Sequence, residues 1–480
     1  MTYQLPQHIS KEKIFIVNRS AIDNRLDAQY YSANLDLSGF VKLSSIAIVK
    51  GGKRIPKGYG YSEDATPYHY LRVADMDSDA PVDVNSLMNI SNEVFDILER
   101  YEINEGELAI SIAGTIGKTS ILKDIPDGKR VILTENCAKI LVKPNIELLS
   151  DYLKICLELP IVKKQLDLNY IQTTIPKLGL DKIVGIKLPP IPYMQKQQEI
   201  VDYVNEAYTQ KQAKETEAQQ LLDSIDDYLL KELGINVIAS SGNADSVADR
   251  IFVKNLRELE RDRFDSNYYA NKYNTLIRSI RKGIYPLYIL GDSDITSFLS
   301  VGQTPKSEYY SDTKTDFPII KAGCYTGSEI DLSKVSFTIN KQAYTIKKGD
   351  IFILSAAHQA EYIAKQICYL HDTPKPNTSF VGELLCVRAS ETVNSMYLYS
   401  VLSTKVYKTL LNREKRGQTS HLYAQDVKQL FVPIPPIAKQ NCIAKHIEEL
   451  RTRAKALQAE GKVILEDAKR KVEQMIIGGE

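Results

Sequence analysis

The chain has 480 residues, of which 43% are hydrophobic and 25% are charged, and its formal net charge is +1. This length and composition are typical of a folded protein with two to four domains and exclude an indiscriminate polycation. The sequence has no run of 18 apolar residues, and its first residues lack the basic-then-apolar order of a signal peptide. We therefore expect a cytoplasmic protein that does not enter a membrane.

The first half of the chain predicts short strands followed by helices. Brief apolar runs bounded by Gly, Pro and Asp occur at residues 43–49, 68–73, 108–112 and 138–142. A helix is expected at residues 150–168, and a proline cluster then ends the sheet because proline lacks an N–H donor. Residues 194–233 contain neither Gly nor Pro, carry a heptad-like apolar stripe and end at Gly234, which predicts one long helix.

The same order of elements returns after a linker at residues 236–249. Apolar runs at 317–321, 350–354 and 384–387 predict strands, and a helix is expected at 393–412. A second long helix is predicted at 438–477, before Gly478. Because an isolated amphipathic helix of this length has no cover for its apolar stripe, we expect the two long helices to pair with each other.

Short motifs repeat in unbroken order in the two halves of the chain. An Arg-apolar-Asp-x-x-Tyr-Tyr pattern begins at Arg25 and again at Arg263, and a Gly-acidic-apolar pattern begins at Gly106 and at Gly349. Further matched pairs are Gly52-Lys53 with Gly302-Gln303, Gln172-Thr173-Thr174 with Gln418-Thr419-Ser420, and Gln197 with Gln440. The period is far too long for a solenoid, so it indicates duplication of a whole domain with its helix. We interpret the repeated Arg-Asp-Tyr-Tyr cluster as a structural or subunit-docking element.

Loop residues with cationic, amide or hydroxyl side chains have chemistry that would suit contacts to a nucleic acid, because base edges are read by donors and acceptors and phosphates by cations. In the first copy they are Lys53, Arg54, Lys57, Tyr59, Arg72, Lys118, Gln172, Thr173 and Thr174. In the second copy they are Gln303, Lys306, Lys321, Arg413, Arg416, Gln418, Thr419 and Ser420. The alternatives are a solvated flexible loop for the glycine-rich segment and a helix cap for the Gln-Thr turns.

The sequence contains no recognisable catalytic or metal-binding motif. Gly114 and Gly117 are too close together for a nucleotide-binding loop, and Leu188 stands where an amino-methyltransferase motif needs a polar residue. The six cysteines form no Cys-x-x-Cys pair and have no histidine at metal spacing. We therefore predict no catalytic residue, no cofactor and no metal ligand. Two alternatives stay open: an enzyme with divergent active residues, and a duplicated coiled-coil scaffold without DNA specificity.

The order of elements resembles the DNA-specificity subunit of type I restriction–modification systems over nearly the whole chain. The likeness rests on the turn-strand segments at 106–110 and 349–353, on the Gly-Thr-x-Gly segment at 114–117, and on the proline-to-glutamine start of each long helix. The second copy departs at 357–361, where the Gly-Thr-x-Gly segment is absent.

The resemblance implies an α+β protein with two mixed α/β target-recognition domains of short twisted strands, at residues 1–190 and 250–436. The long helices at 191–235 and 437–480 would form an antiparallel coiled coil that separates these domains. Such a subunit would read a bipartite, asymmetric site in double-stranded DNA without catalysing a reaction. Its partners would be two methyltransferase subunits, and the assembly could recruit motor-nuclease (restriction) subunits.

Overall fold

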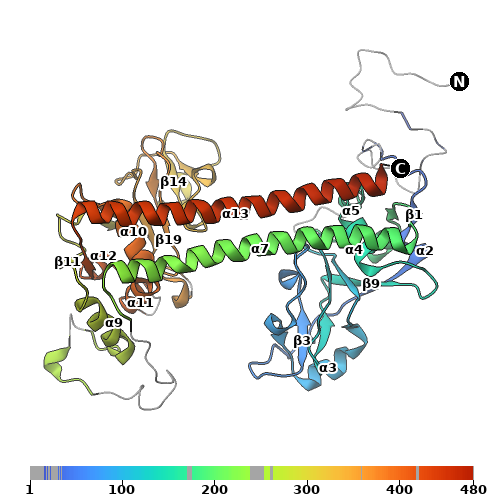
Figure 1. Ribbon diagram of the computed structural model, residues 1–480, viewed down its shortest axis with the longest axis horizontal. Coiled ribbons are helices and arrows are strands. Elements are labelled where there is room, and N and C mark those ends of the chain that lie inside the picture. Colours follow the sequence, from blue (N-terminus) through green and yellow to red (C-terminus); the bar gives the residue numbers. More distant parts are fainter. Residues whose placement is uncertain are drawn as a thin grey trace, which may run out of the picture. The chain divides into compact units, whose positions relative to one another are not determined.

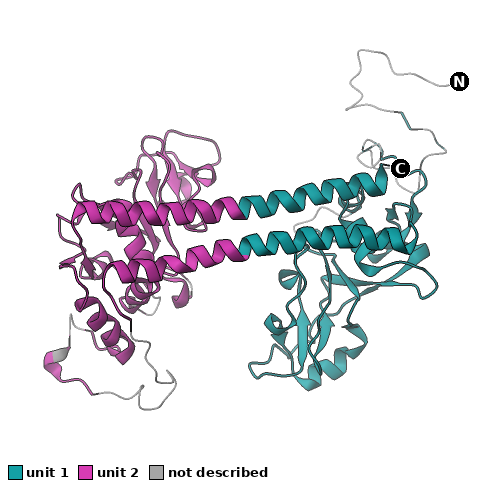
Figure 2. Ribbon diagram, in the orientation of Figure 1, with its two compact units in different colours: residues 1–215, 458–480 teal, residues 216–457 magenta. Residues whose placement is uncertain are grey.

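The computed structural model describes residues 16–17, 19, 22, 31, 33, 35–169, 176–237, 253–259, 263–357, 359–417 and 421–478. The chain divides into two compact units (Figure 2): unit 1 comprises residues 1–215 and 458–480, and unit 2 comprises residues 216–457. Each unit therefore contains a part of each long helix. Within the described ranges, no helix combines the length and the apolar content needed to cross a bilayer.

The strands of unit 1 form two four-stranded sheets and one strand pair (Figure 1). They are β1 (Val41–Lys42), β2 (Ala47–Gly51), β3 (Tyr68–Leu71), β4 (Met88–Asn89), β5 (Glu102–Ile103), β6 (Leu108–Ser111), β7 (Thr119–Ile121), β8 (Arg130–Leu133), β9 (Cys137–Val142) and β10 (Lys187–Leu188). The main sheet has the antiparallel order β2-β9-β6-β7. The second sheet has the order β4-β3-β8-β5, with β3 and β8 parallel, and β1 pairs with β10.

The helices of unit 1 are α2 (Leu43–Ile46), α3 (Asn92–Leu98), α4 (Ser150–Glu158), α5 (Pro160–Asp167), α6 (Leu180–Val184) and the first part of α7 (Met194–Glu232). The single helix predicted at 150–168 is wrong, because Pro160 has no N–H to continue the hydrogen-bond ladder and the chain divides there. The strand predicted at 43–49 is also partly wrong, since its first residues form α2.

Unit 2 repeats this arrangement with a larger main sheet. Its strands are β11 (Leu287–Ile289), β12 (Thr296–Val301), β13 (Tyr310–Ser311), β14 (Pro318–Ile320), β15 (Tyr325–Thr326), β16 (Glu329–Ile330), β17 (Ser336–Thr338), β18 (Ile351–Leu354), β19 (Ile367–Tyr369), β20 (Ser379–Phe380), β21 (Leu384–Ala389) and β22 (Phe431–Pro433). The main sheet has the order β12-β21-β18-β19-β16-β15, the second has β13-β17-β14-β20, and β11 pairs with β22. The parallel pair β14–β20 corresponds to β3–β8 of unit 1.

The helices of unit 2 are the last part of α7, α9 (Asn271–Arg281), α10 (Ser395–Ser403), α11 (Lys405–Arg413), α12 (Ala424–Val427) and the first half of α13 (Ile437–Ile477). The continuous helix predicted at 393–412 divides at Thr404, whose hydroxyl accepts a hydrogen bond from the amide of Tyr407 at 3.2 Å and caps α11. The two predicted long helices, α7 and α13, are confirmed.

The central strands of each main sheet, β6 and β18, are buried on both faces. In β6, Leu108 and Ile110 pack into a core with α4 and α5, whereas Ala109 packs into a core shared with the second sheet. In β18, Ile351 and Phe352 likewise point into two different cores. This alternation follows from the two-residue period of a strand, and it fixes both layers against the central sheet.

The two long helices pack antiparallel within unit 1. Ala207 of α7 shares an apolar cluster with Leu465 of α13, and further along α7 the Lys214 Nζ lies 2.8 Å from a carboxylate oxygen of Glu460. Gly461 sits at this contact, where an added Cβ would lie 3.3 Å from the carbonyl oxygen of Lys211. Small residues therefore allow the two backbones to approach closely.

The helices pair in the same sense within unit 2. Ala218 of α7 contacts Ala454 of α13, and the end of α7 at Glu232 forms an ion pair with Lys439 near the start of α13. The predicted antiparallel pairing is thus confirmed in each unit.

Candidate nucleic-acid interface

In unit 1, a loop leaves the main sheet at a glycine that is held entirely by backbone groups. The Gly52 amide donates to the carbonyl oxygen of Cys137 at 2.9 Å, and the Lys53 amide donates to that of Leu133 at 2.9 Å. A Cβ on Gly52 would lie 2.1 Å from the carbonyl oxygen of Thr134, so only glycine fits. The position of Lys53 is therefore fixed by the backbone.

Unit 2 has the same anchor. The Gly302 amide donates to the carbonyl oxygen of Leu384 and the Gln303 amide to that of Phe380, both at 3.1 Å. A Cβ on Gly302 would lie 2.2 Å from the oxygen of Phe380. We call the pairs Gly52-Lys53 and Gly302-Gln303 the loop anchors. Lys53 and Gln303 occupy equivalent backbone positions, yet their side chains differ in chemistry.

Several predicted loops meet at one end of each main sheet. The last residues of β2 and β6 both lie opposite the start of β9, so the loops that follow them leave the sheet together. A bridge between Ala113 and Lys177 brings the segment before α6 to the same end. In unit 2 the ends of β12 and β18 lie opposite the start of β21, and a bridge joins Ala356 to His421. Loops far apart in sequence thus form one candidate surface in each unit.

Six predicted contacts lie outside the described residues: Gln172, Thr173, Thr174, Gln418, Thr419 and Ser420. Their contact with DNA stays a prediction.

The glycine-rich loop of unit 1 presents exposed side chains on a fixed backbone. Lys53, Arg54, Lys57 and Tyr59 are all exposed. Arg54 lies 2.6 Å from a carboxylate oxygen of Glu135, but 78% of its side chain remains accessible. The Tyr59 hydroxyl donates to Glu93 at 2.6 Å. This loop is therefore ordered by contacts of its own, and cationic groups remain on its surface.

Tyr70, a buried residue that the sequence analysis did not identify, also stabilises this loop. The buried Tyr70 donates its hydroxyl proton to the carbonyl oxygen of Lys53 at 2.7 Å. Burial raises the pKa of Tyr70 to about 12, so the hydroxyl stays protonated and remains a donor at neutral pH.

Two other predicted contacts of unit 1 are more constrained. Arg72 makes a bidentate ion pair with Asp75, at 2.8 and 2.7 Å, and hydrogen bonding to that carboxylate raises the pKa of the guanidinium. Lys118 is half-buried, and its backbone amide donates to the Ser111 hydroxyl at 2.9 Å. The guanidinium of Arg72 and the backbone of Lys118 are therefore held in place, and both residues are less exposed than Lys53 or Lys57.

In unit 2 the exposed residues Gln303 and Lys306 line a groove of about 540 Å³. The groove is lined by Gln303, Thr304, Pro305, Lys306, Tyr309, Asn340, Lys341 and Gln342. The last three were missed in the sequence because they lie in a turn that only long-range strand pairing brings to this loop. Lys321 lies elsewhere, half-buried with its ammonium 3.9 Å from the ring centroid of Tyr310.

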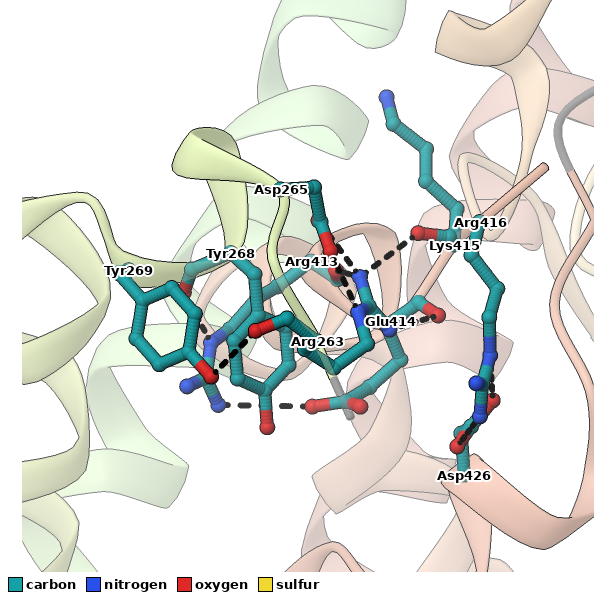
Figure 3. Close-up of polar contacts among 9 residues, drawn as sticks. All are labelled: Arg263, Asp265, Tyr268, Tyr269, Arg413, Glu414, Lys415, Arg416 and Asp426. Atoms are coloured by element: carbon teal, nitrogen blue, oxygen red, sulfur yellow. Dashed lines mark hydrogen bonds and ion pairs between the residues drawn. The ribbon is translucent and has the colours of Figure 1, made fainter. Parts of the chain in front are cut away.

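The repeated Arg-Asp-Tyr-Tyr motif forms a cluster in unit 2 in which Arg263, Tyr268 and Tyr269 are buried and Asp265 is exposed (Figure 3). Arg263 is 3% exposed and pairs with Asp265 through two hydrogen bonds, at 2.7 and 2.8 Å. Its guanidinium also donates to three successive carbonyl oxygens, those of Arg413 (3.4 Å), Glu414 (3.2 Å) and Lys415 (3.0 Å). The motif therefore holds the segment before α9 against the end of α11. Of the matching residues in the first copy, Arg25, Asp27 and Tyr30 lie outside the described residues.

Two predicted DNA contacts, Arg413 and Arg416, make contacts within or beside this cluster. Arg413 is 8% exposed, its guanidinium lies 3.7 Å from the ring centroid of Tyr268, and its Nε donates to the carbonyl oxygen of Tyr268 at 2.8 Å. Arg416 makes a bidentate ion pair with Asp426. Arg413 is enclosed, whereas Arg416 is half-buried and its guanidinium is engaged by Asp426; contact of either residue with DNA stays a prediction.

The chain is similar to a known protein family and to several solved structures. The model of the type I restriction modification DNA specificity domain matches residues 36–223 and again 293–464. Comparison with curated proteins finds no match. Among solved structures, the chain is similar to the S subunit of a type I restriction-modification system from M. genitalium, with 14% identity over 91% of this chain and 95% of that chain and a TM-score of 0.41.

Two further structures are similar over comparable lengths. One comes from a study of complex assembly and conformational transition of the type I R-M system, with 13% identity, coverage of 91% and 96%, and a TM-score of 0.47. The other is the HsdS subunit from Thermoanaerobacter tengcongensis, with 14% identity, coverage of 92% and 96%, and a TM-score of 0.33. The family model is the finding that carries the assignment, because it matches twice and covers most of the chain: the protein belongs to the type I restriction modification DNA specificity family, and its role is that of a DNA-specificity subunit, not of a catalyst.

Proposed function

We propose that each unit reads one half of a bipartite, asymmetric DNA site. The observation that carries this proposal is the pair of loop anchors, which start two loops from the same backbone geometry with Lys53 in one unit and Gln303 in the other. Equivalent backbone frameworks would dock on a DNA duplex in the same orientation, whereas unlike side chains at the equivalent position would select different bases. Two different half-sites follow.

Phosphate contacts would set the register of each unit on the duplex. Lys57 in unit 1 and Lys306 in unit 2 are exposed and adjoin the loop anchors. Neutralising phosphates releases counterions, so binding should weaken steeply as salt rises. The net charge of +1 is compatible with this because a few cations at the two surfaces suffice.

The proposal extends to partners. A specificity subunit acts by presenting a chosen site to a catalyst, and methylation of a base needs a pocket into which the base is flipped. Two methyltransferase subunits are the proposed partners, and motor-nuclease subunits would join the restriction assembly.

A domain exchange tests the bipartite reading. The full chain is produced with a methyltransferase partner, and methylated positions are mapped across the host genome before and after residues 40–190 are replaced by those of another specificity subunit. One half-site should change while the other half-site and the partner requirement persist. Loss of both half-sites in a folded exchange protein would contradict independent reading by two units.

A second assay separates this proposal from an enzyme with divergent active residues. The purified chain alone, given DNA and a methyl donor, should transfer no methyl groups. Turnover by the chain alone would overturn the assignment of the chemistry to a partner.

A further inference from the structure

The groove of unit 2 has the side-chain chemistry that base recognition uses. Amides, lysines, a threonine and a tyrosine line it, and none of its eight lining residues is acidic. By contrast, a groove of about 490 Å³ in unit 1 is lined by three carboxylates, those of Glu102, Glu105 and Asp124, beside the cations Lys129 and Arg130, and Arg130 is already paired with Glu102. Of these two grooves, the one in unit 2 is therefore suited to a nucleic acid.

The two walls of this groove are joined at their base. The loop at 303–309 leads into β13 and the turn at 340–342 follows β17, and these strands pair with Tyr310 opposite Thr338. The Ile339 amide donates to the carbonyl oxygen of Tyr309 at 3.0 Å. The fully buried Thr338 donates its hydroxyl proton to the carbonyl oxygen of Asn340 at 2.9 Å. The groove is thus preorganised, which lowers the entropic cost of binding.

Polar groups in the groove remain available to a ligand. The side chains of Gln303, Asn340 and Lys341 are exposed, and none makes a hydrogen bond or ion pair with the described part of the chain. The Gln342 amide donates to the carbonyl oxygen of Asn340 at 3.0 Å, which helps to fix the turn. Gln303 and Asn340 lie on opposite walls of the groove, so both side-chain amides can face a nucleic acid that is bound between the walls.

We propose that Gln303 and Asn340 are specificity-determining residues of unit 2 and that each reads an A·T base pair. This proposal rests on the proposed function. A side-chain amide carries a donor beside an acceptor, and this pattern matches N6 and N7 of adenine in the major groove. Lys306 and Lys341, on the same two walls, contact phosphates and set the register.

The loop anchors give this proposal its counterpart in unit 1. Lys53 of unit 1 occupies the backbone position that is equivalent to that of Gln303 in unit 2. Its ammonium group, however, has three donors and no acceptor. Such a group suits the paired acceptors O6 and N7 of guanine and not the mixed pattern of adenine. The same position therefore selects different bases in the two units.

The test uses the full chain produced with a methyltransferase partner. Gln303→Ala and Asn340→Ala are compared with the wild type by genome-wide mapping of methylated sites and by binding to duplexes that carry each base pair in turn. Each variant should lose about 5- to 150-fold of its discrimination at one A·T pair of a single half-site. The other half-site should be unchanged, and Lys53→Ala should relax that one instead.

Two further variants separate base reading from phosphate contact and from folding. Lys306→Ala should weaken binding to all duplexes alike and reduce the slope of log affinity against log salt by about 1. Gln429→Ala removes an exposed amide outside the groove and should change nothing. Since the replaced side chains are exposed, the melting temperatures should match that of the wild type.

The outcomes are distinguishable. A wild-type complex that shows no bipartite discrimination would overturn the proposed function itself. A wild-type complex that discriminates while Gln303→Ala and Asn340→Ala keep full discrimination would overturn this inference alone. Loss of discrimination at a G·C pair would overturn the assignment to adenine.

Discussion

A single guanidinium, that of Arg263, holds the end of α11. The carbonyl oxygens to which it donates belong to the last residue of α11 and to the two residues that follow it, where the helical hydrogen-bond ladder supplies no donor. Arg263→Ala should lower the free energy of unfolding of unit 2 by about 3 kcal/mol, because the carbonyls and Asp265 lose their shared donor. Chemical denaturation measures this, with the exposed Arg278→Ala as a control. A loss no larger than that of the control would contradict the structural role.

His69 makes the stability of unit 1 depend on pH. Its ring is 3% exposed, and neither nitrogen has a partner at hydrogen-bonding geometry in the described part of the chain. Burial, aided by the charge of Lys129, lowers the pKa of His69 in the folded state. As pH falls below about 6.5, the unfolded chain therefore binds a proton that the folded chain does not, and stability declines by up to about 1.4 kcal/mol per pH unit.

A neutral replacement should remove this dependence. The denaturation midpoint of His69→Leu, followed from pH 7.5 to 5, should fall less steeply than that of the wild type, which retains its titrating imidazole. Parallel curves for the two proteins would show that His69 does not titrate differently in the folded and unfolded states.

At the scale of elements, a buried glutamine joins each long helix to its unit. The Gln197 side chain accepts from the Leu149 amide at 2.9 Å and donates to the carbonyl oxygens of Glu147 (2.9 Å) and Pro192 (2.8 Å). Gln440 in unit 2 likewise accepts from Asn394 at 2.9 Å and donates to Pro435 at 2.9 Å. The duplicated glutamine in the sequence thus marks a repeated joint between helix and unit.

Breaking this joint should be costly. Gln197→Leu leaves one amide and two carbonyl groups unsatisfied, so the free energy of unfolding should fall by about 3 kcal/mol. Denaturation and hydrogen exchange at 147–149 measure the effect. The exposed neighbour Gln198→Leu is the matched control. Equal stability of the two variants would contradict the role of Gln197.

Periodicity and repeated motifs sufficed to predict the two long helices and their pairing, whereas the α+β class and the antiparallel sense of the pairing came from the family resemblance. These patterns failed where a single residue ends one helix and begins another, as Pro160 and Thr404 do within the two expected continuous helices. The candidate surface was harder to predict. Arg413 has the chemistry of a DNA contact, but it is enclosed by Tyr268, far away in sequence. Asn340 reaches the groove through the β13–β17 pairing, which no local pattern reveals.

At the scale of the whole molecule, paired α7 and α13 make the distance between half-sites testable. Four residues inserted in α7 at 210–219 lengthen a helix by about 6 Å. Because Lys214 lies beside Glu460 in unit 1, a matching insertion near Glu460 keeps the helices in register. The unread spacer should grow by about two base pairs, which methylated-site mapping would reveal. The control is a four-residue insertion in the loop at 372–373, which is exposed; an unchanged spacer in the helix variant would contradict a helical ruler.

The loop anchors also bear on how such a protein can change over generations. The loop anchors are held through main-chain atoms, and no contact that holds these loops uses the side chain of Lys53 or Gln303, so replacing either residue disturbs no framework hydrogen bond. Replacing Gly52 or Gly302 would force backbone atoms into contact and be removed as a folding defect. The most and the least replaceable positions are therefore immediate neighbours, and new target sequences can arise by point mutation on an unchanged scaffold.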